Sequence, residues 1–141
     1  MAPKGSPAAD ATSLADLAKT KIGVQLGTTS LDAVNASIKP STQPQVYNDS
    51  NDTVRALKSK RIDAIVVDLP TAFYLTAAEV PGSKIVGQFE APGGDRWGLL
   101  LQKGSKLTAC LNQALAKLSS AGQLKRLQDQ WMGCQAAPEL R

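Results

Sequence analysis

The chain has 141 residues, of which 43% are hydrophobic and 20% charged, a composition typical of one soluble globular domain. Its formal charge of +4 does not indicate nucleic-acid binding, because the basic residues are scattered and the cluster Lys58, Lys60 and Arg61 has no interleaved aromatic residues to stack on bases. Histidine is absent, which excludes histidine-dependent catalytic triads. We expect neither a metal nor a cofactor.

The chain begins with a segment of linker composition, followed by a strand and a helix. Residues 1–12 are small, polar and contain proline and glycine, as in a flexible linker. Residues 21–25 form an apolar strand pattern that ends at Gly27, and from Thr28 the apolar residues take a helical spacing that Pro40 closes. These features predict a first strand-then-helix unit.

The next segment repeats this order. A short strand is expected around Val46, and a helix near residues 53–59. The run IDAIVVD, residues 62–68, is rich in β-branched residues, as expected of a buried parallel strand, and Pro70 suits the first turn of a following helix. Alternating strands and helices predict an α/β fold with a mostly parallel sheet flanked by helices.

The last third of the chain is expected to be mainly helical. KIVGQF, residues 84–89, and RWGLLLQ, residues 96–102, are expected to form strands on either side of a glycine pair. Two apolar helix faces follow, within residues 107–118 and 124–131, and Gly122 separates them. This pattern predicts a C-terminal helical hairpin.

The two cysteines lack the spacing of a metal site. Cys110 lies on the first helix of this hairpin and Cys134 lies just beyond the second, 24 positions on. A hairpin brings such positions together, so we expect a disulfide between them in an oxidising compartment, which would stabilise the chain by on the order of 3 kcal/mol. Two unpaired thiols are the alternative.

Polar residues follow two of the expected parallel strands, where ligands of such sheets usually bind. Gly27 permits a tight turn, and the amides and hydroxyls of the following Thr28, Thr29 and Ser30 could donate to an anion. Asp68 ends the second strand and could accept from a cation such as an ammonium group. The alternative for the threonines and for Asp68 is that they only cap the helices that follow.

Four segments, in this order, resemble the family 3 extracellular solute-binding proteins, which bind amino acids for ABC importers. These segments are KIGVQLGTTS, VRALKSKRIDAIVVDLPTAFYL, RWGLLLQKGSKL and ALAKLSSAGQLKRLQDQWMG. The resemblance extends from about Lys4 to Gly133. It implies a two-lobed binding protein, not an enzyme, that closes on an amino acid and delivers it to a membrane permease.

The resemblance also implies roles for individual residues. In this family the GTT turn of the second lobe donates to the α-carboxylate of the ligand, which assigns Thr28 and Thr29, after Gly27, to that group. The aspartate of the DAxxxD block accepts from the α-ammonium, which assigns Asp68, and Gln25 is expected close to the ligand. The expected ligand is a polar or charged amino acid, with no cofactor and no nucleic acid as partner.

Compared with the family, the chain lacks most of a first lobe, which supplies an arginine for the carboxylate. The resemblance implies a linker or crossing segment at 1–12 and the second lobe at 13–92. A returning crossing strand and helical hairpin of the first lobe follow at 93–133, and a tail at 134–141. With half a site, we expect weak ligand binding and self-association through the exposed C-terminal hairpin.

The resemblance implies a location outside the cytoplasm. The parent protein is expected to carry a signal peptide and to act in the periplasm or anchored at the outer cell surface. Two other functions remain open. Similar modules form the ligand-sensing part of some receptors, and dehydratases of prephenate-like acids share the fold. The dehydratase is disfavoured because the chain has no histidine and no plausible pair of carboxylates.

Overall fold

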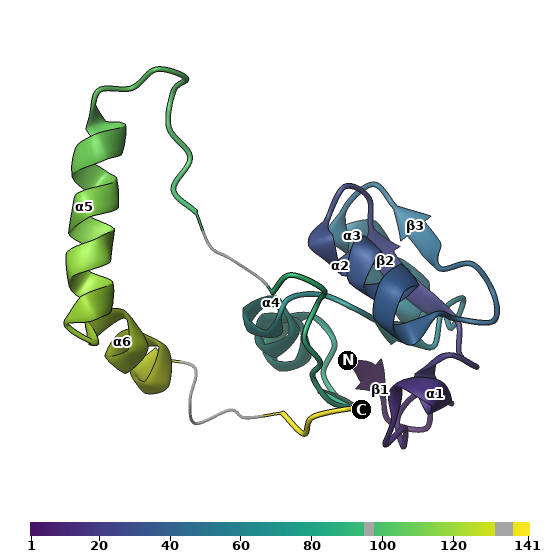
Figure 1. Ribbon diagram of the computed structural model, residues 1–141. Helices are drawn as coiled ribbons and strands as arrows, with labels where there is room; N and C mark the ends of the chain where they lie inside the picture. Colours follow the sequence, from purple (N-terminus) through teal and green to yellow (C-terminus); the bar gives the residue numbers. More distant parts are fainter. Residues whose placement is uncertain (95–97, 132–136) are drawn as a thin grey trace. The chain divides into compact units, whose positions relative to one another are not determined.

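The computed structural model describes residues 1–94, 98–131 and 137–141, and it divides into two units (Figure 1). Unit 1 contains Met1–Asp95 and Ala137–Arg141, and unit 2 contains Arg96–Ala136.

The centre of unit 1 is a three-stranded parallel sheet. Its order is β3–β2–β4, with β2 at Ile22–Gln25, β3 at Gln45–Tyr47 and β4 at Ala64–Ile65. Gly23 of β2 pairs with Gln45 on one side and with Ile65 on the other. Helices connect these strands, so the predicted α/β fold with a parallel sheet is confirmed.

Each helix of unit 1 begins at a residue that prefers the N-cap position. Ser13 and Asp16 form a capping box around α1 (Leu14–Leu17), and Asp49 caps α3 (Ser50–Lys58) through the Asp52 amide. The other two helices each continue as a π-helical turn: α2 (Thr29–Ala33) into η1 (Val34–Ile38), and α4 (Leu69–Tyr74) into η2 (Leu75–Glu79).

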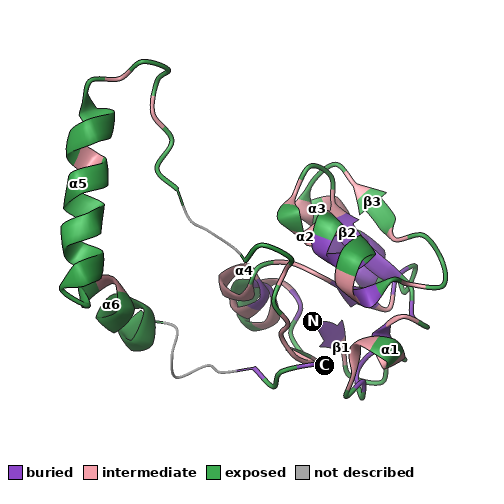
Figure 2. Cartoon of the chain, in the orientation of Figure 1, coloured by how far each residue is buried: buried purple, intermediate pink, exposed green. Residues whose placement is uncertain are grey.

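The two faces of the sheet carry separate hydrophobic clusters. Ala64 and Ile65 are neighbours in β4, and their side chains belong to different clusters, as the alternation of a strand requires. The first cluster contains Leu17, Ile22, Val24, Val34 and Ile38; the second contains Val54, Leu57, Ile62, Ile65 and Leu75. Figure 2 shows the buried residues gathered around β2. Burial of each large side chain contributes about 1.5–3 kcal/mol.

The N-terminal segment packs against this sheet instead of standing apart as a linker. β1 (Ala2–Pro3) pairs antiparallel with β5 (Ser83–Lys84). Ala2 and Ala8 are completely buried, since the small side chains that suggest a linker also fit close to a sheet.

The C-terminal segment 137–141 also returns to unit 1. Gln88 donates its amide to the Pro138 carbonyl at 2.7 Å and accepts from the Leu140 amide at 2.8 Å. Leu140 is buried against Gly87, where an added Cβ would lie 2.5 Å from the Leu140 Cγ. The strand expected at 84–89 is therefore short: only Ser83 and Lys84 pair as a strand, and Gln88 makes a single bridge.

Unit 2 contains the predicted helical hairpin, formed by α5 (Leu107–Ser120) and α6 (Gln123–Trp131). None of its described residues is buried. The strand expected at 96–102 is wrong for the described residues 98–102: they form no ladder, and Leu100 is 99% exposed. A strand needs a partner for its backbone hydrogen bonds, and this run has none in the described part of the chain.

The predicted disulfide is not supported. Cys110 is exposed and carries a free thiol, while Cys134 lies outside the described residues. In the described ranges, no helix combines the length and apolar character needed to cross a membrane.

The amino group of Met1 leads to a pH-dependent stability. It is buried and donates to the Ile65 carbonyl at 2.8 Å, and burial lowers its pKa from the ordinary value of 8.0 to about 6. The unfolded chain therefore binds more protons than the folded chain between about pH 6 and 8, so the free energy of unfolding rises with pH across this window. The chain has no histidine whose titration would overlap with it.

Urea denaturation should show that the free energy of unfolding rises by up to roughly 3 kcal/mol between about pH 5.5 and 8.5. The sample must retain Met1, which its measured mass verifies. Acetylation of the amino terminus removes the titrating group, so the acetylated chain should show no such rise. An unmodified chain with a flat profile would contradict the burial of this group.

Candidate ligand-binding site

The parallel pairing of β2 and β4 brings the segments that follow them to the same edge of the sheet. The first is the turn after β2, in which Gly27 has a φ of +72°. A Cβ added there would contact nothing within 4 Å, so the left-handed backbone alone makes glycine favourable.

The side chains around this turn mainly hold it in place. The Thr28 hydroxyl donates to the Gln25 carbonyl at 2.8 Å, closing the turn. Thr28 is the N-cap residue of α2, but its side chain makes no capping hydrogen bond. The Gln25 side-chain oxygen accepts from the Ser50 hydroxyl at 2.9 Å, which ties the end of β2 to the start of α3. The Thr28 hydroxyl and the Gln25 side chain, which the sequence analysis placed at the ligand, are thus already hydrogen-bonded within the protein.

Asp68 caps the helix that follows β4. One carboxylate oxygen accepts from the Thr71 amide at 3.0 Å and the other from the Thr71 hydroxyl at 2.8 Å. The capping role that the sequence left open is therefore present. Capping does not exhaust the group, because each carboxylate oxygen has a second lone pair and Asp68 is exposed.

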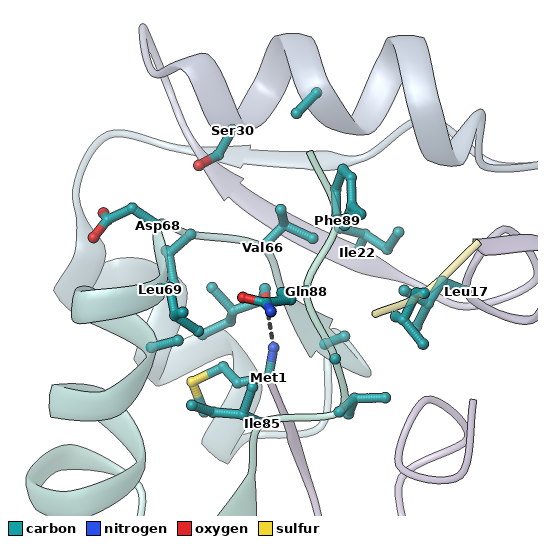
Figure 3. A pocket seen from close by; sticks show the side chains of 18 of the residues that line it. Met1, Leu17, Ile22, Ser30, Val66, Asp68, Leu69, Ile85, Gln88 and Phe89 are labelled. Atoms are coloured by element: carbon teal, nitrogen blue, oxygen red, sulfur yellow. Dashed lines mark hydrogen bonds between the residues drawn. The ribbon is translucent and has the colours of Figure 1, made fainter. Parts of the chain in front are cut away.

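A pocket with a volume of about 150 Å³ lies within unit 1, and its polar side chains include those of Thr29, Ser30 and Asp68. Figure 3 shows Ser30 and Asp68 at the same end of this pocket, with Leu17 on the other side. Most of the remaining lining is aliphatic. Gln25, Gly27 and Thr28 do not line the pocket, so the structure brings only part of the predicted set together.

Among the lining residues that sequence reasoning did not single out, two lie at the end of a predicted strand. Gln88 and Phe89 come from the end of the KIVGQF run, and both line the pocket. This run has the direction of β4, because β1 is antiparallel to β5 and pairs antiparallel with β4 at Ile65. The rule that predicted Asp68, polar residues at the carboxyl end of a parallel strand, also applies to Gln88.

The polar groups at the pocket suit a ligand that carries both a positive and a negative charge. Asp68 is the only charged side chain among the lining residues, and the turn after β2 offers amide and hydroxyl donors close to it. The volume is below the roughly 300–1,000 Å³ of most complete small-molecule sites. In the described residues, no group of three histidine, cysteine, aspartate or glutamate side chains is placed to hold a metal.

No family model matches the chain. Among solved structures it is similar to an ancestral arginine-binding protein. The structure bound to glutamine is 30% identical over 94% of this chain, with a TM-score of 0.69, and the structure bound to arginine is 30% identical over 93%, with a TM-score of 0.64. The arginine-, lysine-, histidine-binding protein ArtJ from Geobacillus stearothermophilus shares the fold, at 22% identity over 94% of this chain and a TM-score of 0.64.

This chain spans only part of these proteins. It covers 57% of each ancestral structure and 56% of ArtJ. All three are amino-acid-binding proteins, and the similarity extends over nearly all of this chain.

Substitution of Asp68 can separate its structural role from its charge. Asp68→Ala removes the cap of α4 and should lower the free energy of unfolding by about 1 kcal/mol, whereas Asp68→Asn keeps an oxygen acceptor and should change it by only a few tenths. Urea denaturation measures both. Equal losses in the two variants would show that the carboxylate charge, and not the cap, stabilises this end of the helix.

Proposed function

We propose that this chain is the second lobe, with part of the first, of a family 3 solute-binding protein that binds an amino acid for an ABC importer. One observation carries the proposal: the turn Gly27–Ser30 and Asp68 follow neighbouring parallel strands, and Ser30 and Asp68 lie at the same end of one pocket. The amino-acid-binding proteins to which the chain is similar support it.

In the proposed complex the turn binds the α-carboxylate of the ligand. The donors are the amides of Thr28 and Thr29, with hydroxyl groups of the turn beside them. The Thr28 hydroxyl cannot donate to the ligand while it donates to Gln25, so its contribution comes from the amide. Gln25 acts by fixing the turn through Ser50. Gly27 allows the backbone conformation that directs these amides.

Asp68 binds the α-ammonium of the ligand. Its oxygens accept from Thr71 on the helix side and keep lone pairs for the ammonium on the solvent side. Both contacts are charge-assisted, so they are stronger than neutral hydrogen bonds. A zwitterion that spans the turn and Asp68 satisfies both ends, which a simple carboxylate or a simple amine cannot do.

The side chain of the ligand is polar or charged in this proposal, as in the arginine and glutamine complexes of the ancestral protein. In the proposed whole protein most of it lies against first-lobe residues that this chain does not contain. We propose that residues 13–92 belong to the second lobe and residues 93–133 to the first. The whole protein acts outside the cytoplasm, anchored at the cell surface, and delivers its ligand to the permease.

Because one lobe leaves most of the ligand in water, arginine should bind this chain with a Kd of about 1 mM or weaker. Addition of arginine to the ¹⁵N-labelled chain should shift the amide signals of residues 27–30 and 68–71. N-acetylarginine lacks the ammonium charge and should bind at least about tenfold more weakly, because it loses a charge-assisted contact.

Asp68→Asn is the matched protein control, since it keeps the helix cap. It should abolish the difference between arginine and N-acetylarginine and leave unfolding nearly unchanged. Shifts confined to residues outside the turn and the start of α4, or equal binding of the two ligands by the unmodified chain, would refute the proposed site.

We also propose that the exposed hairpin of unit 2 associates with a second copy. Leu107 and Leu127 are more than half exposed, and Trp131 is 73% exposed. Short helices are marginal in water without apolar packing, so a hairpin with no buried residue needs a partner surface.

Sedimentation velocity should therefore detect a dimer or larger species that grows with protein concentration. Leu118→Lys places a charge on the apolar face of α5 and should shift the chain toward monomer. Asn112→Lys adds the same charge to the polar side of α5 and should leave the distribution unchanged. A monomer at every concentration would exclude self-association.

A further inference from the structure

The fold gathers cations at the amino end of the parallel sheet, opposite the candidate ligand site. Lys21 directly precedes β2, and its carbonyl accepts from the Asp63 amide at 2.7 Å, just before β4. Gln45, the first residue of β3, donates its side-chain amide to the Arg61 carbonyl at 3.4 Å. The segments that lead into the three strands therefore lie together, and two of them carry a cation.

Helix α3 adds two lysines at this end. It begins beside the carboxyl end of β2, where the Ser50 hydroxyl donates to Gln25, and it runs back to end at Lys58. Lys60 and Arg61 lie in the turn that follows and leads toward β4. The cluster that is local in the sequence thus lies beside the cation that precedes β2.

Two further connections bring the remaining cations to the same end. The amide and the hydroxyl of Ser41 both donate to the Ala18 carbonyl, at 2.8 and 3.0 Å, which joins the ends of η1 and α1. The Ser6 hydroxyl donates to the Asp63 carbonyl at 2.6 Å, which holds the N-terminal segment there. The seven exposed cations of this end, called the basic edge below, are Lys4, Lys19, Lys21, Lys39, Lys58, Lys60 and Arg61.

Two of these lysines have a backbone conformation that favours glycine. Lys39 has a φ of +51° and Lys60 a φ of +58°, and no other non-glycine residue in the described part of the chain has a positive φ. Both follow a helix, where a cation gains from the helix dipole, but the left-handed backbone costs a residue with a Cβ at least as much. Helix stability therefore does not account for lysine at these positions.

The charge of the basic edge has little compensation nearby. Within the described residues, none of its seven side chains forms an ion pair. Asp63 places a carboxylate on this edge, and it accepts from the Lys21 amide at 2.8 Å. Of the two acidic side chains in the segment before β2, Asp10 pairs with Lys84 and Asp16 forms the capping box of α1. Such an array of cations attracts a partner that presents many negative charges.

The residue types of the basic edge favour a membrane surface over a protein or a nucleic acid. Six of the seven cations are lysines, flexible point charges that suit a fluid array of phosphate groups. None of the large exposed hydrophobic side chains of the described residues lies in its segments, 4–6, 19–21, 39–41 and 58–63. The edge therefore lacks the apolar anchor of a protein interface and the aromatic rings that stack on nucleobases.

We propose that the basic edge binds the anionic phosphate headgroups of a membrane, with the amino end of the sheet toward the lipid. The opposite end carries Asp68 and, at the start of α3, Asp49 and Asp52, so like-charge repulsion keeps that end away from the same surface. The lipid thus orients unit 1 with the candidate ligand site facing away from the bilayer. Each lysine near the surface strengthens binding by about fivefold.

This lipid contact does not depend on the proposed amino-acid site, because the two use opposite ends of the sheet. Addition of arginine at constant ionic strength should leave lipid binding unchanged. A chain that binds lipid and no amino acid would refute only the proposed function, and the reverse result would refute only the lipid contact.

Co-sedimentation of the full chain with vesicles tests the proposal. Vesicles of equal parts phosphatidylglycerol and phosphatidylcholine should bind the chain, whereas vesicles of phosphatidylcholine alone should not. The double variant Lys39→Gly/Lys60→Gly should bind about tenfold more weakly or less, because it loses two charges. It should resist urea at least as well as the unmodified chain, because glycine favours both backbone conformations.

Lys103→Gly/Lys106→Gly is the matched control, since it removes the same charge from exposed positions in unit 2. It should bind the anionic vesicles like the unmodified chain. Equal weakening of the two double variants would overturn the proposal, as would equal binding to neutral vesicles. So would binding that persists at on the order of 1 M salt, where the screening length is only about 3 Å.

The orientation gives a second readout. Spin-labelled lipid in the anionic vesicles should broaden the amide signals of residues 19–21 and 58–61 and spare those of residues 27–30. The reverse pattern would contradict the proposed contact. Binding of duplex DNA or of polyglutamate without binding of vesicles would identify a nucleic acid or an acidic protein as the partner, and either result would refute the membrane.

Discussion

The parallel pairing of β2 with β4 is the constraint on which the rest of unit 1 depends. It places the carboxyl ends of both strands at the same end of the sheet, so Ser30 and Asp68, almost forty positions apart in the sequence, line one pocket there. Gly23 contributes to this arrangement, because an added Cβ would collide with the Ile62 side chain and approach Thr53 on α3. The close approach of α3 to β2 in turn carries Ser50, which holds Gln25 and hence the turn.

Much of the fold could be predicted because its signals are local. The run before Asp68 is apolar and β-branched, and Pro70 is well suited to the first turn of a helix, so the strand, the cap and the helix could each be inferred from neighbouring residues. The capping role of Asp68 was one of two readings that the sequence left open. The other reading, that Asp68 binds a ligand, rests on the same observation, an aspartate at the end of a strand. The local pattern therefore cannot distinguish capping from ligand binding.

The features that could not be predicted depend on distant partners. The small residues near the N-terminus are compatible with a linker, and only the edges of β4 and β5 turn them into a packed strand. Conversely, the run 98–102 has a strand composition but lies exposed, because propensity for strands is expressed only where a neighbouring edge is present. The Thr28 hydroxyl is a similar case. A hydroxyl at this position could donate to a ligand, but in the structure it donates to the Gln25 carbonyl.

The return of the C-terminal segment to Gln88 makes unit 2 an insertion in the sequence of unit 1. The hydrogen bonds of Gln88 to Pro138 and Leu140 close a loop that contains the insertion. The entropic free-energy cost of closing such a loop rises by only about 0.6 kcal/mol for each doubling of its length. The stability of unit 1 is therefore nearly indifferent to how long the inserted segment is. Segments of quite different length could thus be placed between Gln88 and Pro138 with little change in the free energy of unfolding of unit 1.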